Sequence, residues 1–277
     1  MIDDRYAHNP ADVAHMTTRE LREAFLGHGL FQPGQVSGIH THHDRILVFG
    51  IVPLDEPLSL PVPEQARAQY LLQRREAGVI NIGGPGAVHV DGTDYELGHT
   101  GTMYLGRGTN DVSFSSDDPD NPAAFYVFTA ASHQDLPTTL ITPGMVNVVE
   151  LGSDDGANRR TLNQCIYEGG TKSSQIAFGF TQVHPGSAWN TMPAHTHDRR
   201  TECYLYFDLD ANERVFHIMG EPSETRHLVV ANREFVISPS WSLHFGAGTG
   251  AYSFVWATAG ENTTYDDMDS VRVTDMT

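Results

Sequence analysis

The chain has 277 residues, of which 39% are hydrophobic and 19% charged, and its formal net charge is −18 at pH 7. This length suffices for one large or two ordinary domains, and the composition is that of a folded globular protein rather than a disordered one. No run is rich in lysine or arginine, so we expect the chain to bind neither nucleic acid nor an anionic membrane.

The cysteine content and the first residues of the chain indicate its expected cellular compartment. Cys165 and Cys203 are the two cysteines of the chain, too few for a disulfide framework, so we expect two buried reduced thiols. The segment Met1-Ile-Asp-Asp-Arg5 lacks the basic and apolar regions of a signal peptide. No apolar stretch approaches the roughly 20 residues that span a bilayer. The expected localisation is therefore the cytoplasm.

One helix is predicted near the start. Thr17-Thr-Arg-Glu20 has the pattern of a capping box, and an apolar stripe with helical spacing follows. Gly27 or Gly29 is expected to end the helix. The stripe consists of Leu21, Phe25 and Leu26.

Strands are predicted for most of the remaining chain. Asp91-Gly92 lies between two alternating segments, which predicts a hairpin with a type I′ turn over residues 88–95. No long alternation of strands and helices appears, which argues against a doubly wound α/β fold. The predicted class is therefore all-β. The β-rich runs are residues 46–49, 79–82, 125–128, 204–207 and 252–256.

The sequence also repeats itself. Residues 106–114 share five identities with residues 246–254 at a constant offset of 140. A second similarity, at a shorter offset, relates Arg74-Arg75-Glu76 to Arg199-Arg200-Thr-Glu202. The pattern predicts two related β-barrel domains with a boundary between about 140 and 175. We place them at residues 1–155 and 156–277.

The segment from His195 to Phe207 carries the clearest chemical signal. His195 and His197 are separated by one residue, so in a strand their imidazoles point to the same face. Glu202 opens the following apolar run and can contribute a carboxylate from a neighbouring strand. Two imidazoles and a carboxylate are ligands suited to a divalent transition metal.

A fourth ligand is predicted at His244, in a strand that restarts after a Pro-containing turn. A His-x-His pair, a Glu and a later His resemble the double motif of the cupin barrels. This resemblance implies a β-sandwich barrel with a metal inside its mouth. Trp189 and Trp241 stand where cupin motifs usually have glycine, a change that affects turn shape more than ligand supply.

The first predicted domain is not expected to hold a metal. At the offset of 140, Tyr104 takes the place of His244, and no His-x-His precedes Glu76. Three upstream histidines form a second His-x-His, but no Glu follows at the right distance, so they are expected to be polar loop residues or subunit contacts. They are His40, His42 and His43. Three further histidines, His184, His217 and His227, have no such partners and are not expected to bind metal.

Several segments together resemble the 5-keto-4-deoxyuronate isomerases, the ketol-isomerases of the KduI type, over essentially the whole chain. These segments are Asp44-Arg45-Ile46, residues 74–84, residues 158–161, residues 189–197, Glu224-Thr225-Arg226-His227, residues 237–242 and residues 266–269. The resemblance implies a zinc-containing bicupin, usually a hexamer, with one Zn²⁺ per subunit. It would convert 4-deoxy-L-threo-5-hexosulose uronate from pectin or related polyuronides to 3-deoxy-D-glycero-2,5-hexodiulosonate. The implied zinc ligands are His195, His197, Glu202 and His244.

This reaction moves a proton between neighbouring carbons, so it needs a general base as well as a metal that stabilises an enediolate. The sequence does not name the base; the candidates are Asp267, Asp266, Glu261 and Glu202, with Arg160 as a further catalytic candidate. The expected partner is a small anionic sugar acid. Its carboxylate is expected to bind Arg159, Arg199 or Arg160 by a bidentate pair.

Three alternatives remain at this stage. A 5-deoxy-glucuronate isomerase of inositol breakdown would share fold, metal and chemistry. A cupin dioxygenase would use iron at the same ligands and consume oxygen. A sugar-binding or storage cupin would bind uronates without turnover.

Overall fold

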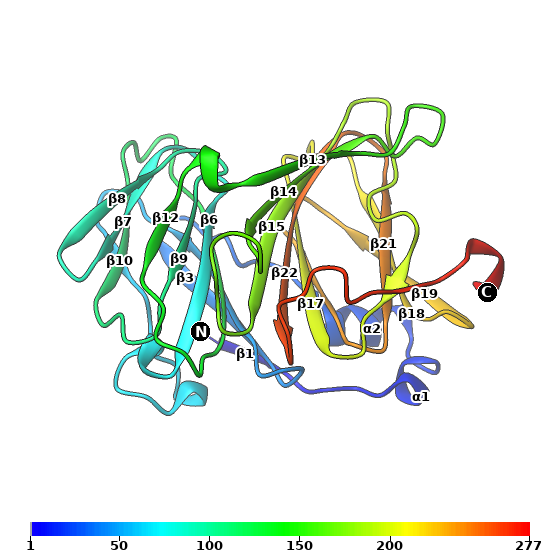
Figure 1. Ribbon diagram of the computed structural model, residues 1–277, viewed down its shortest axis with the longest axis horizontal. Coiled ribbons are helices and arrows are strands. Elements are labelled where there is room, and N and C mark those ends of the chain that lie inside the picture. Colours follow the sequence, from blue (N-terminus) through cyan, green and yellow to red (C-terminus); the bar gives the residue numbers. More distant parts are fainter. Residues whose placement is uncertain (1) are drawn as a thin grey trace. The chain divides into compact units, whose positions relative to one another are not determined.

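The computed structural model describes residues 2–277, in which strands greatly outnumber short helices (Figure 1). This confirms the predicted all-β class. The contacts divide the chain into two compact units. Unit 1 comprises residues 2–5, 29–146 and 165–177, and unit 2 comprises residues 6–28, 147–164 and 178–277. The domain limits predicted from the sequence, 1–155 and 156–277, stay a prediction.

The predicted N-terminal helix is present and belongs to unit 2. After the short helix α1 (Pro10–Val13), α2 spans Thr18–Phe25. The capping box is confirmed, because Thr17 accepts from the Glu20 N–H while the Glu20 carboxylate accepts from the Thr17 N–H at 2.8 Å. The helix ends at Phe25, before either predicted glycine, because Leu26 and Gly27 form strand β2 and pair with β20. None of the helices formed by residues 2–277 has the length and apolarity needed to span a bilayer.

Unit 1 is built on two antiparallel sheets, apart from the parallel pair β1–β3. The larger has the order β1-β3-β4-β11-β6-β9-β12 and the smaller the order β5-β10-β7-β8. The predicted hairpin is confirmed, since Asp91 and Gly92 both have positive φ and join β7 to β8. The strands are β1 (Ile2–Arg5), β3 (Gln35–Thr41), β4 (Leu47–Val52), β5 (Leu58–Ser59), β6 (Arg75–Asn81), β7 (Gly86–Val90), β8 (Thr93–Leu97), β9 (Thr102–Leu105), β10 (Val112–Ser116), β11 (Phe125–Ala131) and β12 (Thr139–Ile141). The short 3₁₀ turns are Glu64–Ala66, Leu71–Gln73 and Pro143–Met145.

Unit 2 repeats this plan. Its main sheet has the order β13-β14-β15-β22-β17-β20-β2, a second sheet has the order β19-β18-β21, and β16 pairs with β23. The strands are β13 (Asn147–Leu151), β14 (Arg160–Ile166), β15 (Ile176–Val183), β16 (His195–Thr196), β17 (Arg200–Phe207), β18 (Val215–Glu221), β19 (Glu224–Val230), β20 (Phe235–Ser238), β21 (Leu243–Gly248), β22 (Tyr252–Gly260) and β23 (Asp269–Ser270), and a 3₁₀ turn spans Val273–Asp275. Cys165 and Cys203 are buried, and neither forms a disulfide, as predicted.

The shorter-offset similarity marks equivalent strands. β6 lies between β11 and β9, and β17 lies between β22 and β20. Arg75 and Glu76 open β6, just as Arg200 and Glu202 lie at the start of β17. The two units therefore share a topology.

The backbone of Asn81 bonds to that of Thr100 and Gly101 just as the backbone of Tyr206 bonds to that of Arg233 and Glu234, so Asn81 and Tyr206 are equivalent. Counted four residues back along each strand, the counterpart of Glu202 is Ala77, and Glu76 lies on the other face of β6.

The predicted equivalence of Tyr104 and His244 is wrong. Hairpins β7–β8 and β18–β19 each close through a two-residue turn, and counted back from these turns, Val88 matches Met219. Val88 pairs with Phe114, and Met219 pairs with His244. The counterpart of His244 is therefore the buried ring of Phe114, while Tyr104 lies on β9.

The offset of 140 fails for a physical reason. Residues 106–114 run from a turn into β10, whereas residues 246–254 run from the end of β21 into β22. Gly-Thr pairs in turns and Ser-Phe pairs at strand starts are common in hairpins. The sequence match therefore joined two segments that occupy different places in the sheets.

Glu76 is fully buried and satisfied within unit 1. Its carboxylate accepts from the Tyr104 hydroxyl at 2.6 Å and from the N–H groups of Ser174 at 2.7 Å, Gln175 at 2.7 Å and Ile176 at 3.1 Å. Each N–H would lose its acceptor if the carboxylate were removed, and an unsatisfied buried donor costs about 1–3 kcal/mol.

Glu76→Ala is therefore expected to lower the free energy of unfolding by at least about 3 kcal/mol, and Tyr104→Phe by about 1 kcal/mol. Urea titration followed by circular dichroism measures both values. The control is Glu96→Ala, which changes an exposed carboxylate on β8. Equal effects of the two Glu→Ala changes would contradict this account of Glu76.

Candidate metal centre

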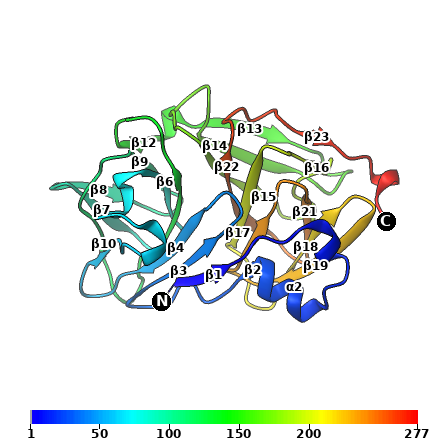
Figure 2. The same ribbon diagram turned by 90° about the horizontal axis from the view of Figure 1, so that it is seen from below.

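The four residues predicted as ligands come together inside unit 2. His195 lies on β16, His197 in the turn that follows, Glu202 on β17 and His244 on β21. Their ligand atoms all lie within 4.8 Å of one another. Figure 2 shows β16 beside β21, so a turn segment and two sheets deliver the four side chains to one point. Glu202, His197 and His244 are buried.

The donor atoms are spaced as ligands of one ion would be. The His197 Nε2 lies 2.9 Å and the His244 Nε2 lies 3.2 Å from the Glu202 Oε2. The Nε2 atoms of His195 and His244 are 3.2 Å apart. Donors that each lie about 2.0 Å from one tetrahedral ion are separated by roughly 3.3 Å.

The Nδ1 atoms of His197 and His244 already have hydrogen-bond partners. The His197 Nδ1 lies 3.0 Å from the carbonyl oxygen of Arg200. The His244 Nδ1 lies 3.2 Å from the carbonyl oxygen of Ser242 and 3.1 Å from the hydroxyl of Ser238. Hydrogen bonds of this kind fix the tautomer of a metal-binding histidine, because an Nδ1–H donor leaves the Nε2 lone pair for the metal.

The hydrogen-bond acceptors around the His197 and His244 rings favour a bound cation. A neutral imidazole has one N–H and can donate from one nitrogen only. His197 faces a carbonyl on one side and the Glu202 carboxylate on the other, and His244 does the same. Two buried imidazolium ions would be costly, whereas a divalent ion between the Nε2 atoms and the carboxylate satisfies every contact. The residues present therefore fit a metal.

The electrostatics favour the ligand forms of these groups. Burial raises the pKa of Glu202, but the nearby His244 and hydrogen bonds from His197 and His244 outweigh it and hold that pKa well below its usual range. Burial, aided by His244, lowers the pKa of His195 to about 3. The carboxylate is thus ionised and the His195 imidazole neutral at pH 7.

A further polar side chain of this barrel, His217, was not predicted as part of the site. It is fully buried on β18, paired with Gly246, two residues beyond His244 on the neighbouring strand. Its Nδ1 lies 2.7 Å from the Tyr206 hydroxyl, while its Nε2 has no hydrogen-bond partner among the described residues. Local spacing carried no signal for it, because His217 lies in the apolar run Val215-Phe-His-Ile-Met219 and no His or Glu lies two residues away.

The predicted arginines have different surroundings. Arg160 is partly buried, donates to the carbonyls of Asn158 at 2.8 Å and Met192 at 3.3 Å, and interacts electrostatically with Tyr204 and Tyr265. Those two tyrosines also interact with Glu202, so Arg160 faces the metal-binding side of the barrel.

Arg159 and Arg199 lie outside this cluster. Arg159 is exposed and directs its guanidinium to His184 at 3.1 Å and Asp154 at 3.4 Å. Arg199 is also exposed, and its charge acts on Asp267. Neither is brought to the four ligands.

Asp267 lies close to the centre without joining it. An Asn262 hydrogen bond of 2.6 Å, assisted by Arg199, Arg200 and His197, lowers the pKa of Asp267. Its interaction with His197 indicates that the C-terminal segment borders the site, whereas Asp266 and Glu261 are exposed.

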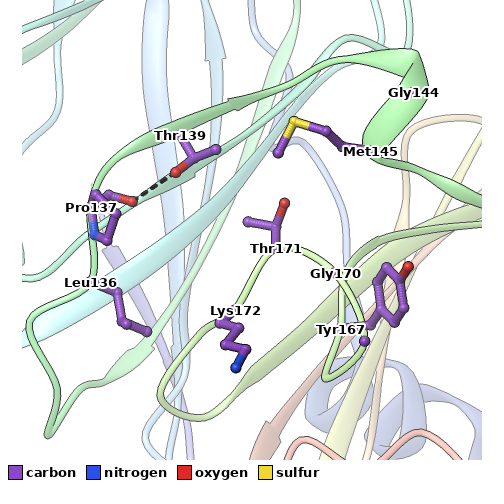
Figure 3. Close-up of a pocket in the computed structure, with 10 residues that line it drawn as sticks. Leu136, Pro137, Thr139, Gly144, Met145, Tyr167, Gly170, Thr171 and Lys172 are labelled. Carbon is purple, nitrogen blue, oxygen red and sulfur yellow. Dashed lines mark hydrogen bonds between the residues drawn. The ribbon is translucent and has the colours of Figure 1, made fainter.

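A pocket of about 550 Å³ lies elsewhere, within unit 1 (Figure 3). Tyr167, Thr171 and Lys172, the one lysine of the chain, line it on one side, and Pro137 and Thr139 on the other. No residue predicted as a ligand or catalyst is among the residues lining this pocket.

Comparisons with known proteins agree with this geometry. A family model described as the KduI/IolB family matches residues 28–273. The chain is 52% identical to the 4-deoxy-L-threo-5-hexosulose-uronate ketol-isomerase of Kineococcus radiotolerans, over 99% of this chain and 100% of that protein. It is 50% identical to the enzyme of the same name from Lachnoclostridium phytofermentans, over 98% and 99%.

Solved structures show the same fold at low identity. An IolB-like protein from Salmonella typhimurium has a TM-score of 0.67 at 16% identity, covering 82% of this chain and 87% of that chain. A Lactobacillus farciminis oxalate decarboxylase has a TM-score of 0.55 at 10% identity, covering 82% and 79%. The fold is the predicted cupin type. The chain belongs to the KduI/IolB family, and its predicted class, an isomerase, is confirmed.

His217 makes the stability of unit 2 depend on pH. Burial, with a contribution from His244, lowers the pKa of His217 from 6.5 to about 3. Between these values the unfolded chain binds the proton and the folded chain does not, so the free energy of unfolding falls as the pH drops below about 6.5. The slope for one such group is about 1.4 kcal/mol per pH unit.

In metal-free protein, His217→Gln is therefore expected to flatten the curve of unfolding free energy against pH. Relative to the wild type, the variant should gain on the order of 2 kcal/mol between pH 7 and pH 5. Urea titrations at each pH measure this difference. Parallel curves would show that His217 is protonated equally in both states.

Proposed function

We propose that this chain is a zinc-dependent ketol-isomerase that converts 4-deoxy-L-threo-5-hexosulose uronate to 3-deoxy-D-glycero-2,5-hexodiulosonate in the breakdown of pectin or related polyuronides. The observation that carries the proposal is the buried group His195, His197, Glu202 and His244, with its Nε2 atoms and carboxylate turned to one point. Full-length relatives named for this reaction at 44–52% identity support the substrate.

Three imidazole nitrogens and one carboxylate oxygen suit zinc, although other divalent ions of the first transition row have affinity for the same donors. When bound, such an ion acts as a Lewis acid towards the oxygens of the sugar acid and lowers the energy of negative charge on them. The centre would carry a charge of about +1 from one dication and one carboxylate, which favours an anionic substrate.

Arg160 is the anchor for the substrate carboxylate. Its guanidinium is held by two backbone carbonyls and is partly buried on the side of the barrel that bears Tyr204 and Tyr265. Burial lowers the pKa of Arg160, but an arginine remains cationic at neutral pH and presents a fork of donors to a carboxylate. The exposed Arg159 and Arg199 have solvated partners and are weaker candidates.

His217 is the group that moves the proton between the two carbons. Its Nε2 is buried and unpaired among residues 2–277, and its Nδ1 is held by Tyr206. The low pKa that burial gives His217 keeps the ring neutral before substrate binds, so Nε2 can accept a proton once negative charge develops nearby. Asp267 is the alternative, but its carboxylate accepts a hydrogen bond from Asn262 and its charge is shared with Arg199 and Arg200, whereas the Nε2 of His217 is buried and unpaired among residues 2–277.

The remaining expectations belong to this proposal. Family resemblance predicts a homohexamer, and we also propose a cytoplasmic location. Light scattering of the purified chain measures the first, and fractionation of cells measures the second.

Wild-type protein mixed with the unsaturated galacturonate product is expected to form the 2,5-diketo acid, observed by proton NMR, with one Zn²⁺ retained at this centre. His197→Ala and His244→Ala should each lose that Zn²⁺ and lower kcat at least about 10³-fold, because the metal supplies the charge stabilisation. Circular dichroism should show that both variants stay folded.

The matched control is His227→Ala, an exposed histidine on β19. It should keep both metal and activity. A metal-free variant with full activity would overturn the proposal. Turnover of 5-deoxy-glucuronate in place of the uronate would favour the related isomerase, and oxygen uptake with bound iron would favour a dioxygenase.

His217→Gln should lower kcat by about 10²–10⁴ while leaving bound zinc unchanged, since a general base contributes that factor. Asp267→Asn should lower it less. Steady-state kinetics together with metal content distinguish the two roles. A larger loss in Asp267→Asn than in His217→Gln would assign the proton transfer to Asp267.

A further inference from the structure

We propose that Asp4, His40 and His42 form a second site for a divalent transition-metal ion, within unit 1. All three residues belong to that unit, and none contributes to the four-ligand centre of unit 2. The proposal is independent of the isomerase reaction.

Strand pairing places the three side chains on one face. β1 runs parallel to β3 with Asp4 opposite His40, so the two side chains share a face of the sheet. His42 follows His40 by two residues, and its N–H donates to the carbonyl of Arg5 at 2.9 Å, which continues the pairing. His42 therefore points to the same face as His40.

The ligand atoms are already close together. The His40 Nδ1 lies 2.8 Å and the His42 Nε2 lies 3.9 Å from the Asp4 Oδ1. The two imidazole centroids are 4.8 Å apart. One ion about 2.0–2.2 Å from each donor requires separations of roughly 3–3.5 Å. The three ligand atoms lie within 4.8 Å of one another, so a rotation of the His42 side chain toward Asp4 and His40 completes the site.

The environment is organised around these donors. His40 is buried, and the second oxygen of Asp4 accepts from the Gln65 amide at 2.8 Å, which orients the carboxylate as outer-shell partners of metal sites do. Asp44 and Arg45 both have positive φ and close the β3–β4 hairpin directly after His42. This turn fixes the backbone that carries the histidines.

Two imidazoles and one carboxylate form a donor set for zinc, iron or cobalt, with coordination positions left for water. The ion would join the four-residue strand β1 to β3 and so stabilise the first strand of the chain. The three donors come from the strand pair itself and from its direct extension, so the site needs no other segment.

Zinc titration of the metal-free, full-length protein tests the proposal. Calorimetry and metal analysis after gel filtration should give two Zn²⁺ per subunit for the wild type. Asp4→Asn, which keeps the size of the side chain, and His42→Ala should each bind one. His197→Ala should also bind one, and the double variant His42→Ala/His197→Ala none.

His43→Ala is the matched control, because it removes the adjacent histidine, which is outside the group. It should bind two Zn²⁺. Cobalt gives a second readout, since its visible absorption should lose one component in Asp4→Asn and the other in His197→Ala. Binding by the wild type of a single Zn²⁺ that is lost in His197→Ala, or binding of two by both Asp4→Asn and His42→Ala, would overturn the site.

A wild type that binds one Zn²⁺, lost in His197→Ala but kept in Asp4→Asn, would overturn this second site and leave the isomerase centre intact. A wild type that binds one Zn²⁺, lost in Asp4→Asn but kept in His197→Ala, would overturn the metal of the isomerase centre and leave this second site intact. The two proposals can therefore fail separately.

Discussion

The constraint on which the rest of the structure depends is that His197 and His244 have oxygen acceptors at both ring nitrogens. In each ring, Nδ1 faces a main-chain carbonyl oxygen and Nε2 faces the Glu202 carboxylate. No arrangement of neutral rings satisfies both sides, and a buried unpaired carboxylate is costly. The main-chain contacts orient both rings, so the barrel presents lone pairs rather than protons to Glu202. That arrangement is stable when a cation lies between them.

The two units share one topology but carry different side chains at equivalent positions of their barrels. Glu202 of unit 2 faces imidazole nitrogens, and Ala77 takes its place in unit 1. Phe114 likewise takes the place of His244, so two apolar core residues of unit 1 stand where unit 2 has two predicted metal ligands. Glu76 precedes Ala77 and therefore lies on the other face of β6. Its carboxylate accepts one hydroxyl and three N–H groups from its own unit and is a structural anchor there.

Features specified by neighbouring residues were predictable from the sequence. The capping box at Thr17, the Asp91-Gly92 turn and the ligand motif from His195 to Glu202 each depend on spacing along one segment. The register of the repeat was not predictable, because matching Gly-Thr and Ser-Phe pairs says nothing about which strand they occupy. His217 was missed because its partner, Tyr206, lies on another sheet. Asp4 could not be recognised as a partner of His40 from spacing alone, because it lies 36 residues upstream and reaches His40 only through the parallel pairing of β1 with β3.

Under the proposed function, an acidic protein that acts on an acid must concentrate its positive charge. The net charge is −18, yet cationic groups near the centre have distinct tasks set by burial. Arg200 is buried beside Glu202 on β17 and donates to main-chain carbonyls of Tyr265 and Asp267. It therefore holds the C-terminal segment against the strand that carries a ligand, and its charge is largely used there. Arg160 donates to the carbonyls of Asn158 and Met192 and interacts with Tyr265. Under the proposed function, the metal and Arg160 would be the two positive groups that an anionic sugar acid bridges.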